Sequence, residues 1–254
     1  MNPIKALVCG ASQGIGEAVA RSFARDGYQV ILLARNQQKL EAIRDSLPGS
    51  GHKVLAHDLA DLAGLKVKIE SELKSGPIQI LVNNSGGPKS GPILQAQPEE
   101  FLQAFSGHVI PSQILVQLLV PGMKAKGSGR ILNIISTSVK VPIPNLGVSN
   151  TIRAAMANWA KTLSLEVGPF GVTVNNILPG FTLTPRFDAL KKAAAEKLKI
   201  TEAEVEEQWK SYIPLGRFAK PSEVADVISF LASEKGSYIT GINLPVDGGR
   251  TQSL

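Results

Sequence analysis

Three glycines near the N-terminus have the spacing of a turn that binds an anion. Gly10, Gly14 and Gly16 follow the apolar run Lys5–Cys9 and open a segment with helical periodicity, Gly14–Arg25. A strand that turns tightly into a helix points unpaired backbone N–H groups and the positive end of the helix dipole at one spot. Glycine allows a positive φ there and lets a pyrophosphate approach the backbone. The pattern G-x-x-x-G-x-G therefore predicts a nucleotide-phosphate site, although its spacing differs from G-x-G-x-x-G.

The end of the second apolar run carries a cation where a carboxylate would hold an unphosphorylated ribose. Arg35 stands where an acidic residue is expected, about twenty positions after the glycine turn. A guanidinium can pair with a 2′-phosphate through two parallel hydrogen bonds. Alternatively, Arg35 is a solvated residue at the start of the helix that Asn36 caps. Because no acid is present, we favour NADP(H) as the cofactor, with NAD(H) as the second choice.

Alternating strand and helix patterns run along the whole chain and place the glycine turn after the first strand. Strands that are apolar throughout are buried on both faces, as in a parallel sheet. The predicted strands cover residues 5–9, 29–33, 53–56, 78–82, 130–135, 172–178 and 239–246. The predicted helices cover residues 14–25, 37–47, 62–74, 99–126, 149–167 and 222–232. This order predicts one α/β domain over residues 1–254, with a doubly wound, seven-stranded parallel sheet, helices on both faces and ligands at the carboxyl ends of the strands.

One region interrupts this alternation. Residues 185–212 form a long, charged, helix-rich insertion between the end of a strand and the next helix. Thr201 and Glu204 have the spacing of a capping box and would open its second helix. Because a substrate lid is placed in this way relative to the ends of the sheet, we expect the insertion to cover the substrate.

Composition indicates a soluble globular protein. Of the 254 residues, 43% are hydrophobic and 19% are charged, and the formal net charge is +6. The lysines and arginines are scattered and lack interleaved aromatic residues, which argues against nucleic acid as a partner. No apolar run reaches the length of a membrane span and no signal peptide is recognised, so we expect no membrane association. We expect the single cysteine, Cys9, to be a small buried hydrophobe in a reducing cytoplasm, and we expect no metal site.

Six motifs in the right order make the chain resemble the short-chain dehydrogenase/reductases, and among them the 3-oxoacyl-acyl-carrier-protein reductase-like branch. The motifs lie at residues 10–16, 57–59, 83–86, 179–184, 213–217 and 246–249. The resemblance implies a Rossmann fold, a homotetramer and a dinucleotide cofactor. The cofactor contacts that it implies, together with Arg35, are Gly10, Ser12, Gln13, Gly14, Ile15, Gly16, Asp58, Leu59, Asn83, Ser85, Gly86, Arg153, Pro179, Gly180, Thr182 and Thr184.

The catalytic stretch departs from the pattern of that family. The family carries Y-x-x-x-K on the helix after the fifth strand, and the matching positions here hold Ser149 and Arg153. The family's serine, thirteen residues before the tyrosine, is retained as Ser136, and its usual asparagine corresponds to His108. The resemblance therefore implies a catalytic set of Ser136, Ser149, Arg153 and His108, in which three of the four positions are changed.

These replacements alter how a proton would reach the oxygen of a reduced carbonyl. A phenol acidified by a neighbouring ammonium group can protonate that oxygen near neutral pH, whereas Ser149 has a much less acidic hydroxyl and no ring. Arg153 keeps a positive charge one helical turn later but does not release a proton. His108 is then the leading candidate for an imidazolium proton donor, with an unperturbed pKa of about 6.5.

Each of these residues also has a purely structural interpretation. Ser149 can be the N-cap of its helix, and His108 can be a buried, hydrogen-bonded core residue. Arg153 is better explained as a ligand of ribose or phosphate than as a surface residue, since its helix is otherwise small and apolar. Tyr212 offers a phenol at the end of the insertion, although its place before Pro214 favours a packing role.

Two functions fit this pattern, and a different reaction class on the same fold, such as dehydration, is a minor third. The first is an NADP(H)-dependent oxidoreductase that acts on a ketone or an alcohol, with its proton supplied by His108, by water or by the insertion. The second is a dinucleotide-binding protein without catalysis, such as a scaffold or cofactor sensor. The loss of the tyrosine and lysine favours the second function, whereas a lid over a small molecule favours the first. We favour the oxidoreductase, assembled as a homotetramer through the small and apolar residues of helices 99–126 and 149–167.

Overall fold

Seven parallel strands form one sheet in the computed structural model, which describes residues 3–253. The strands are β1 (Lys5–Cys9), β2 (Gln29–Ala34), β3 (Lys53–Ala56), β4 (Ile80–Asn83), β5 (Gly129–Ile134), β6 (Val172–Pro179) and β7 (Asn243–Val246). Their spatial order is β3-β2-β1-β4-β5-β6-β7. The order reverses between β1 and β4, and in folds of this type ligands bind beyond the carboxyl ends of the strands at such a point. The predicted doubly wound α/β fold is confirmed.

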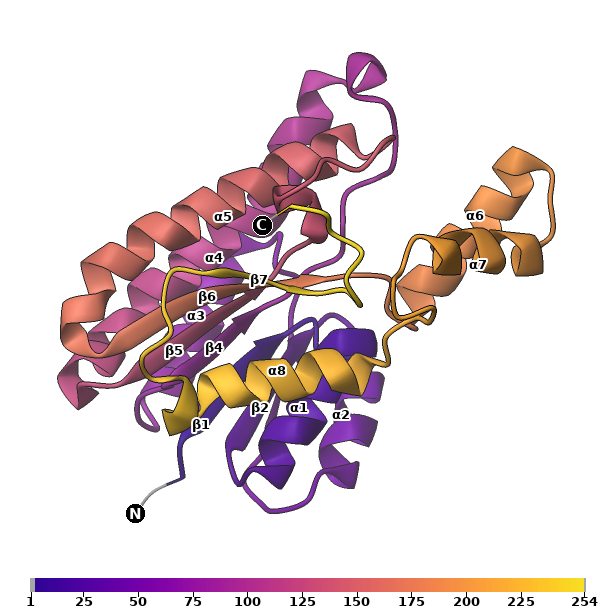
Figure 1. The fold of residues 1–254 in the computed structure, drawn as a ribbon. Helices are drawn as coiled ribbons and strands as arrows, with labels where there is room; N and C mark the ends of the chain where they lie inside the picture. The colour runs from indigo at the N-terminus through magenta and orange to yellow at the C-terminus, as the bar shows by residue number, and fades with distance from the viewer. Residues whose placement is uncertain (1–2, 254) are drawn as a thin grey trace.

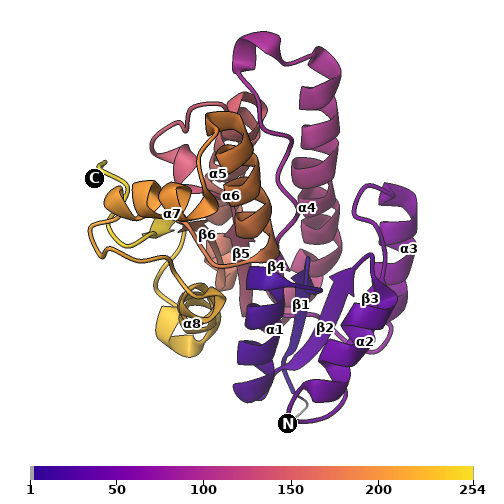
Figure 2. The ribbon, with the colours of Figure 1, turned by 90° about the vertical axis from the view of Figure 1, so that its right-hand side faces the viewer.

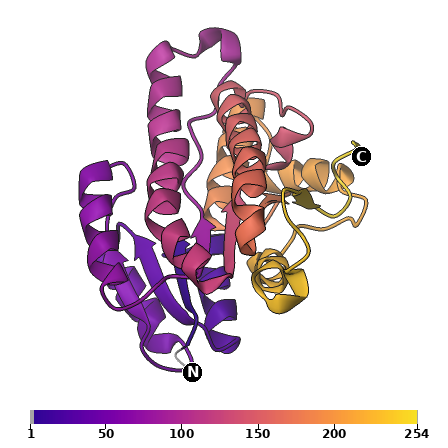
Figure 3. The same cartoon turned by 90° about the vertical axis from the view of Figure 1, so that its left-hand side faces the viewer.

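Helices cover both faces of the sheet (Figure 1). One layer holds α1 (Gly14–Arg25), α2 (Gln37–Ser46) and α8 (Pro221–Ala232), and the other holds α3 (Leu62–Leu73), α4 (Pro98–Lys126) and α5 (Gly147–Val167). Figures 2 and 3 show these two layers from opposite sides. Alternate strand residues enter opposite cores, since Val8 packs under α1 and α8 whereas Leu7 packs under α3 and α4. Burial on both faces explains why most strand residues are apolar.

The insertion forms two helices that project beyond the sheet, α6 (Pro185–Leu198) and α7 (Glu202–Ser211) (Figure 1). The Glu204 backbone N–H donates to the Thr201 hydroxyl at 3.2 Å, and the Thr201 N–H donates to the Glu204 carboxylate at 2.8 Å, which confirms the predicted capping box. The base of the insertion is a small aromatic core in which Phe181 and Trp209 stack with ring centroids 4.7 Å apart. This core joins α7 to the segment that follows β6.

The helix α4 combines unusual length with an apolar composition. It has 29 residues and contains an 18-residue window with a mean hydropathy of 1.2. By length and composition alone, this helix is long and apolar enough to cross a membrane. This finding corrects the expectation that no segment would reach that length. Half of the window is buried, and Leu115, Leu119 and Met123 belong to the core that α4 shares with α3, α5 and the sheet. The composition of α4 is therefore that of a core helix in this fold.

Most element boundaries match the sequence pattern, and the differences have local causes. β4 begins at Ile80 rather than at residue 78, and β7 is shorter than the predicted 239–246. α5 begins at Gly147, because the Gly147 backbone N–H donates to the Gly91 carbonyl at 3.1 Å and a bridge joins Gly91 to Leu146 directly before the helix. Leu146 is the N-cap and Ser149 lies inside the first turn, so the prediction that Ser149 is an N-cap is wrong.

A row of four asparagine side chains crosses the sheet from β4 to β7. The strand register pairs Asn83 with Asn133, Asn133 with Asn176, and Asn176 with Asn243. Each amide nitrogen donates to the next amide oxygen at 2.8 Å, from Asn83 through Asn133 and Asn176 to Asn243. Asn133 is completely buried, so its hydrogen bonds satisfy polar groups that would otherwise be costly inside the core.

Candidate functional site

The glycine turn after β1 has the geometry of a phosphate cradle. Gly10 and Gly14 have φ values of +61° and +60°, in the left-handed region that favours glycine. Gly16 packs against the Gly10 carbonyl so closely that any Cβ would collide with the backbone. The N-cap of α1, Gln13, makes no side-chain hydrogen bond to the first turn. The backbone N–H groups at the start of α1 are thus left to bind an anion.

The ends of β2 and β3 place a cation and a carboxylate side by side. Arg35 directly follows β2, and its Nη1 lies 4.0 Å from Oδ2 of Asp58, with side chains 80% and 53% exposed. An exposed ion pair at this distance contributes little free energy, so Arg35 can turn to another anion at low cost. Asn36 caps α2 as expected, since its Oδ1 accepts a hydrogen bond from the Lys39 backbone N–H at 2.9 Å.

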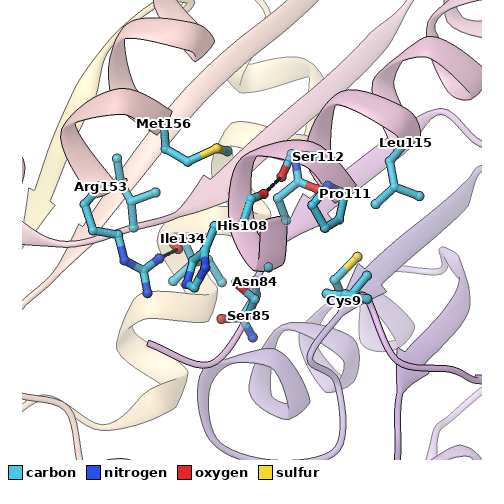
Figure 4. A pocket seen from close by; sticks show the side chains of 14 residues that line it. Cys9, Asn84, Ser85, His108, Pro111, Ser112, Leu115, Ile134, Arg153 and Met156 are labelled. Carbon is cyan, nitrogen blue, oxygen red and sulfur yellow. Dashed lines mark hydrogen bonds between the residues drawn. The ribbon is translucent and has the colours of Figure 1, made fainter. Parts of the chain in front are cut away.

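A cavity at the carboxyl ends of β1, β4 and β5 brings several of the predicted site residues together (Figure 4). Its lining includes Leu59, Asn83, Ser85, His108 and Arg153. The imidazole of His108, from α4, and the guanidinium of Arg153, from α5, lie next to each other in Figure 4. Residues that are far apart in the sequence therefore line one cavity, together with Cys9, which directly precedes the glycine turn.

Arg153 is a buried cation with an unsatisfied nitrogen. Its side chain is on α5, the residue is 8% exposed, and its Nη1 donates to the Ile134 carbonyl at 3.2 Å. Nε has no hydrogen-bond partner among residues 3–253. Burial, and to a smaller extent the positive charge of Arg186, lowers the pKa of Arg153 to about 10. The guanidinium remains charged at neutral pH and offers free N–H groups to the cavity.

His108 is held as a neutral ring. It is 7% exposed, and its Nδ1 lies 2.9 Å from the Ala104 carbonyl oxygen. Burial, followed by the charge of Arg153, lowers the pKa of His108 to about 4, although the backbone of Ala104 and of Gly86 opposes this shift. The expectation that His108 titrates near neutral pH is therefore wrong. The Nε2 atom has no hydrogen-bond partner in the described part of the chain and is left as a lone-pair site.

The two predicted catalytic serines do not line the cavity. Ser136 follows β5 and caps the short 3-10 turn Thr137–Val139, where its hydroxyl accepts from the Ser138 backbone N–H at 3.1 Å. Its own hydroxyl proton is free to donate elsewhere. Ser149 is half-buried in the first turn of α5. The structure thus unites His108 and Arg153 in the cavity and leaves both serines outside its lining.

The segment after β6 connects the phosphate cradle to the insertion. The Thr182 hydroxyl donates to the Gly180 carbonyl at 3.1 Å, and the Thr184 hydroxyl accepts from the Phe187 backbone N–H at 3.2 Å as the N-cap of α6. A Cβ added to Gly14 would lie 3.1 Å from the Thr184 methyl group. The last of the predicted cofactor residues 179–184, Thr184, therefore packs against the glycine turn.

Arg186 lies in the first turn of α6 and was not predicted from the sequence. Its Nη2 donates to the Pro88 carbonyl at 3.3 Å, and its charge acts on Arg153. A cation in the first turn of a helix opposes the helix dipole, which was the available signal in the sequence. Tyr212, in contrast, is 59% exposed at the end of α7, so the packing role expected for it is wrong.

Cys9 is a buried core residue, as expected. It is 1% exposed, and burial raises the pKa of its thiol to about 12, so the thiol is unreactive at neutral pH. Within residues 3–253, no group of three or more His, Cys, Asp or Glu side chains could hold a metal ion.

Known proteins share both the sequence and the fold over nearly the whole chain. Residues 10–251 match the family model described as enoyl-(acyl carrier protein) reductase. The chain is 32% identical to the NADPH-dependent reductase BacG of Bacillus subtilis over 261 residues, which cover 100% of both chains. It is 31% identical to 3-oxoacyl-[acyl-carrier-protein] reductase FabG of Staphylococcus aureus, with 96% of each chain covered. The crystal structure of L-sorbose reductase from Gluconobacter frateurii, complexed with NADPH and L-sorbose, is similar with a TM-score of 0.91 and 32% identity, covering 100% of this chain and 98% of that one.

Proposed function

Since the chain belongs to the short-chain dehydrogenase/reductase family, we propose that it is an NADP(H)-dependent oxidoreductase that reduces a carbonyl group of a small molecule. One observation carries the proposal. His108 Nε2 and Arg153 Nε are buried without hydrogen-bond partners among residues 3–253, and both residues line one cavity beside the phosphate cradle. Buried polar atoms are costly unless a partner satisfies them, so this pair points to a polar ligand.

The residues present fit a phosphorylated dinucleotide. The glycine turn Gly10–Gly16, with Ser12, Gln13 and Ile15, would hold the pyrophosphate at the start of α1. Arg35 would pair with the 2′-phosphate, and Asp58 and Leu59 would flank the adenine. The remaining cofactor residues, which would hold the nicotinamide end, are Asn83, Ser85, Gly86, Arg153, Pro179, Gly180, Thr182 and Thr184. When bound, the cofactor supplies the hydride.

The chain's own side chains would act on the oxygen of the substrate. Arg153 stays cationic up to about pH 10 and would stabilise the negative charge that develops on that oxygen. Ser136 would donate a hydrogen bond to the same oxygen. Ser149 occupies the family's tyrosine position but lacks an acidic group and a ring, so we assign it a positioning role only.

The proton source follows from the state of His108. A pKa of about 4 argues against an imidazolium donor at neutral pH. We propose that the Nε2 lone pair instead holds a water molecule, which delivers the proton to the substrate oxygen, so that His108 is a positioning residue. The hydroxide left behind would be stabilised by the neighbouring Arg153 cation until it takes up a proton from solvent. His108→Leu should lower turnover by about two to four decades, and His108→Asn, which keeps an acceptor, should restore most of it. A fall in activity near pH 6.5 in the wild type would contradict this arrangement.

A second reaction fits the same residues, the reduction of a carbon–carbon double bond conjugated to a carbonyl. The matching family model is described as an enoyl reductase. Hydride addition to such a substrate places the charge on an enolate oxygen, which is less basic than an alkoxide. A cation that stabilises charge without releasing a proton is sufficient for that step, and Arg153 is such a cation.

The experiment measures NADPH consumption with a panel of small ketones, β-ketoesters, quinones and conjugated enones. We expect turnover by the wild type with at least one class, and product analysis then separates carbonyl from double-bond reduction. The double variant Ser149→Tyr with Arg153→Lys tests whether the pocket supports the family's usual chemistry. Turnover by the double variant alone would overturn the proposal and leave a cofactor-binding protein without catalysis.

We further propose that the chain works as a cytoplasmic homotetramer and that residues 185–212 cover the substrate. The aromatic core at the base of α6 and α7, together with the contact between Thr184 and the glycine turn, supports a coupling between this insertion and the cofactor site.

A further inference from the structure

We propose that the substrate carries a carboxylate, which the guanidinium groups of Arg153 and Arg186 bind together beside Gly87. The inference rests on the proposed function, because it names the class of substrate that the same site accepts. It concerns a group of the substrate other than the carbonyl that is reduced.

The two guanidinium groups converge on one point of the backbone. A Cβ added to Gly87 would lie 3.3 Å from Arg186 Nη2 and 3.7 Å from Arg153 Nη2. Gly87 does not have a positive φ, so its backbone would accept a side chain, and an added methyl group would lie against both cations. The two guanidinium groups therefore border the same small region beside Gly87, where one anion would reach both.

Each guanidinium keeps free donors for such a group. Arg153 Nη1 donates to the Ile134 carbonyl at 3.2 Å, and Arg186 Nη2 donates to the Pro88 carbonyl at 3.3 Å. A guanidinium has five N–H groups in a planar fork that matches a carboxylate. The Arg153 Nε is buried and has no partner in the described chain, so part of this donor set is already removed from water.

The positive charges of Arg153 and Arg186 near Gly87 are not balanced by carboxylates in the described part of the chain. Among residues 3–253, no ion pair joins a carboxylate to Arg153 or Arg186, and Asp188, in the same helical turn as Arg186, makes none with it. The proximity of Arg186 also helps to lower the pKa of Arg153, as expected for two like charges. An anion between the two groups would convert this repulsion into two charge-assisted interactions.

The position of Arg186 in α6 also favours a bound anion. It follows the N-cap Thr184 and Pro185, so it lies at the positive end of the α6 dipole, which favours an anion nearby. Since α6 belongs to the insertion and Arg153 to α5, a bound carboxylate would link the insertion to the body of the protein.

The same oxyanion chemistry could come from the cofactor, because Thr184 packs near the glycine turn. We favour the substrate, since the predicted phosphate sites lie at the glycine turn and at Arg35, whereas the two guanidinium groups meet after β4. The affinity of each variant for NADPH separates these two sources.

The test is a calorimetric titration with matched ligands of the protein loaded with NADP⁺, which has no hydride to transfer to a ketone. The probes are 4-oxopentanoate, 5-oxohexanoate and 6-oxoheptanoate, each compared with its methyl ester at constant ionic strength. We expect at least one carboxylate to bind tenfold or more tightly than its ester, because a carboxylate would accept charge-assisted hydrogen bonds from both guanidinium groups.

Arg186→Gln should reduce this preference to about parity and leave NADPH affinity unchanged. Arg25→Gln, the same change at an exposed position in the last turn of α1, should keep the preference.

Gly87→Ala provides a second variant that keeps both cations and places a methyl group against them. It should lower the carboxylate preference, while NADPH binding reports that the fold is intact. Equal affinity for acid and ester in the wild type would overturn the inference, as would a preference that survives Arg186→Gln. A loss of NADPH affinity in Arg186→Gln would assign the anion to the cofactor and also overturn it. A carboxylate preference without hydride transfer would support the anion site and reject only the proposed function.

Discussion

At the scale of single residues, Arg153 shows how one buried cation changes the chemistry of its neighbour. In the cavity it lies beside His108, and its charge adds to burial in favouring the neutral imidazole. An imidazole in this state cannot act as the acid that its ordinary pKa would suggest. Arginine and lysine are therefore not expected to be interchangeable at this position, since the charge of Arg153 also acts on the histidine.

His108 should make stability depend on pH. Its pKa in the folded protein, about 4, lies below the value of about 6.5 expected in the unfolded chain. The unfolded state thus binds the proton more readily, so the stabilising contribution is complete above pH 6.5 and is lost as the pH falls through 4. Between pH 7.5 and 4.5, the wild type should lose on the order of 2–3 kcal/mol more than His108→Asn. Urea unfolding at both pH values and one protein concentration measures this difference, and equal losses in the two proteins would contradict it.

Arg35 should decide the choice between the two nicotinamide cofactors. Its guanidinium is exposed and its ion pair with Asp58 spans 4.0 Å, so it can pair with a 2′-phosphate at little cost. NADPH should bind more tightly than NADH by about one to two decades, and Arg35→Ala should remove the difference by weakening NADPH alone. Calorimetric titration of both cofactors tests this, with Arg25→Ala as the matched control. Equal affinities in the wild type would show that Arg35 is only a solvated residue.

At the scale of elements, the row of asparagines joins four strands through side chains. Asn133 has both neighbours within the row, so Asn133→Leu would leave the Asn83 amide nitrogen and the Asn176 amide oxygen without partners in the core. Each unsatisfied buried group costs about 1–3 kcal/mol, so the variant should lose about 2–6 kcal/mol of unfolding free energy. Ile131→Val, on the same face of β5, removes one methyl group and should cost only about 0.5–1.5 kcal/mol. A smaller loss in Asn133→Leu than in Ile131→Val would show that the row is not a stabilising feature.

The sequence pattern predicted the elements well because burial on both faces makes most residues of each strand apolar, a local property that can be read along the chain. It failed at boundaries where apolar residues lie in connections, as at Ile78 and Ile239, and at α5, whose start depends on a contact with Gly91. These limits have one cause. Hydrophobic periodicity reports burial, whereas the start of an element also depends on a partner elsewhere in the chain.

The candidate site was predictable in its residue types but not in their states. Motif resemblance identified His108 and Arg153, yet the lowered pKa of His108 arises from burial and from a charge on another helix. The pairing of Arg153 with Arg186 joins α5 to the insertion, and the asparagine row depends on strand register. Such properties arise when residues from distant segments come into contact, so they cannot be predicted from any one local segment of the sequence.

At the scale of the whole molecule, α4 and α5 leave large apolar side chains in contact with solvent. Leu102 on α4 and Leu165 on α5 are each 69% exposed, and Phe105 on α4 is 39% exposed. In a protein whose α4 already contributes one face to the core, a second apolar face is typical of contact with another subunit. We therefore expect these two helices to pack against their copies in a homotetramer.

Charged substitutions on this face test the expected assembly. Light scattering at micromolar concentration should give the wild type a mass of four 27.0-kDa chains. Leu102→Glu and Leu165→Glu should each reduce that mass, because burying a carboxylate among apolar side chains without a partner is costly. Val67→Glu on α3 is the control, since Val67 is 66% exposed and lies outside the two helices, so its variant should remain a tetramer. A monomer mass for the wild type would rule out the assembly, and a fall in mass for Val67→Glu alone would move the interface to α3.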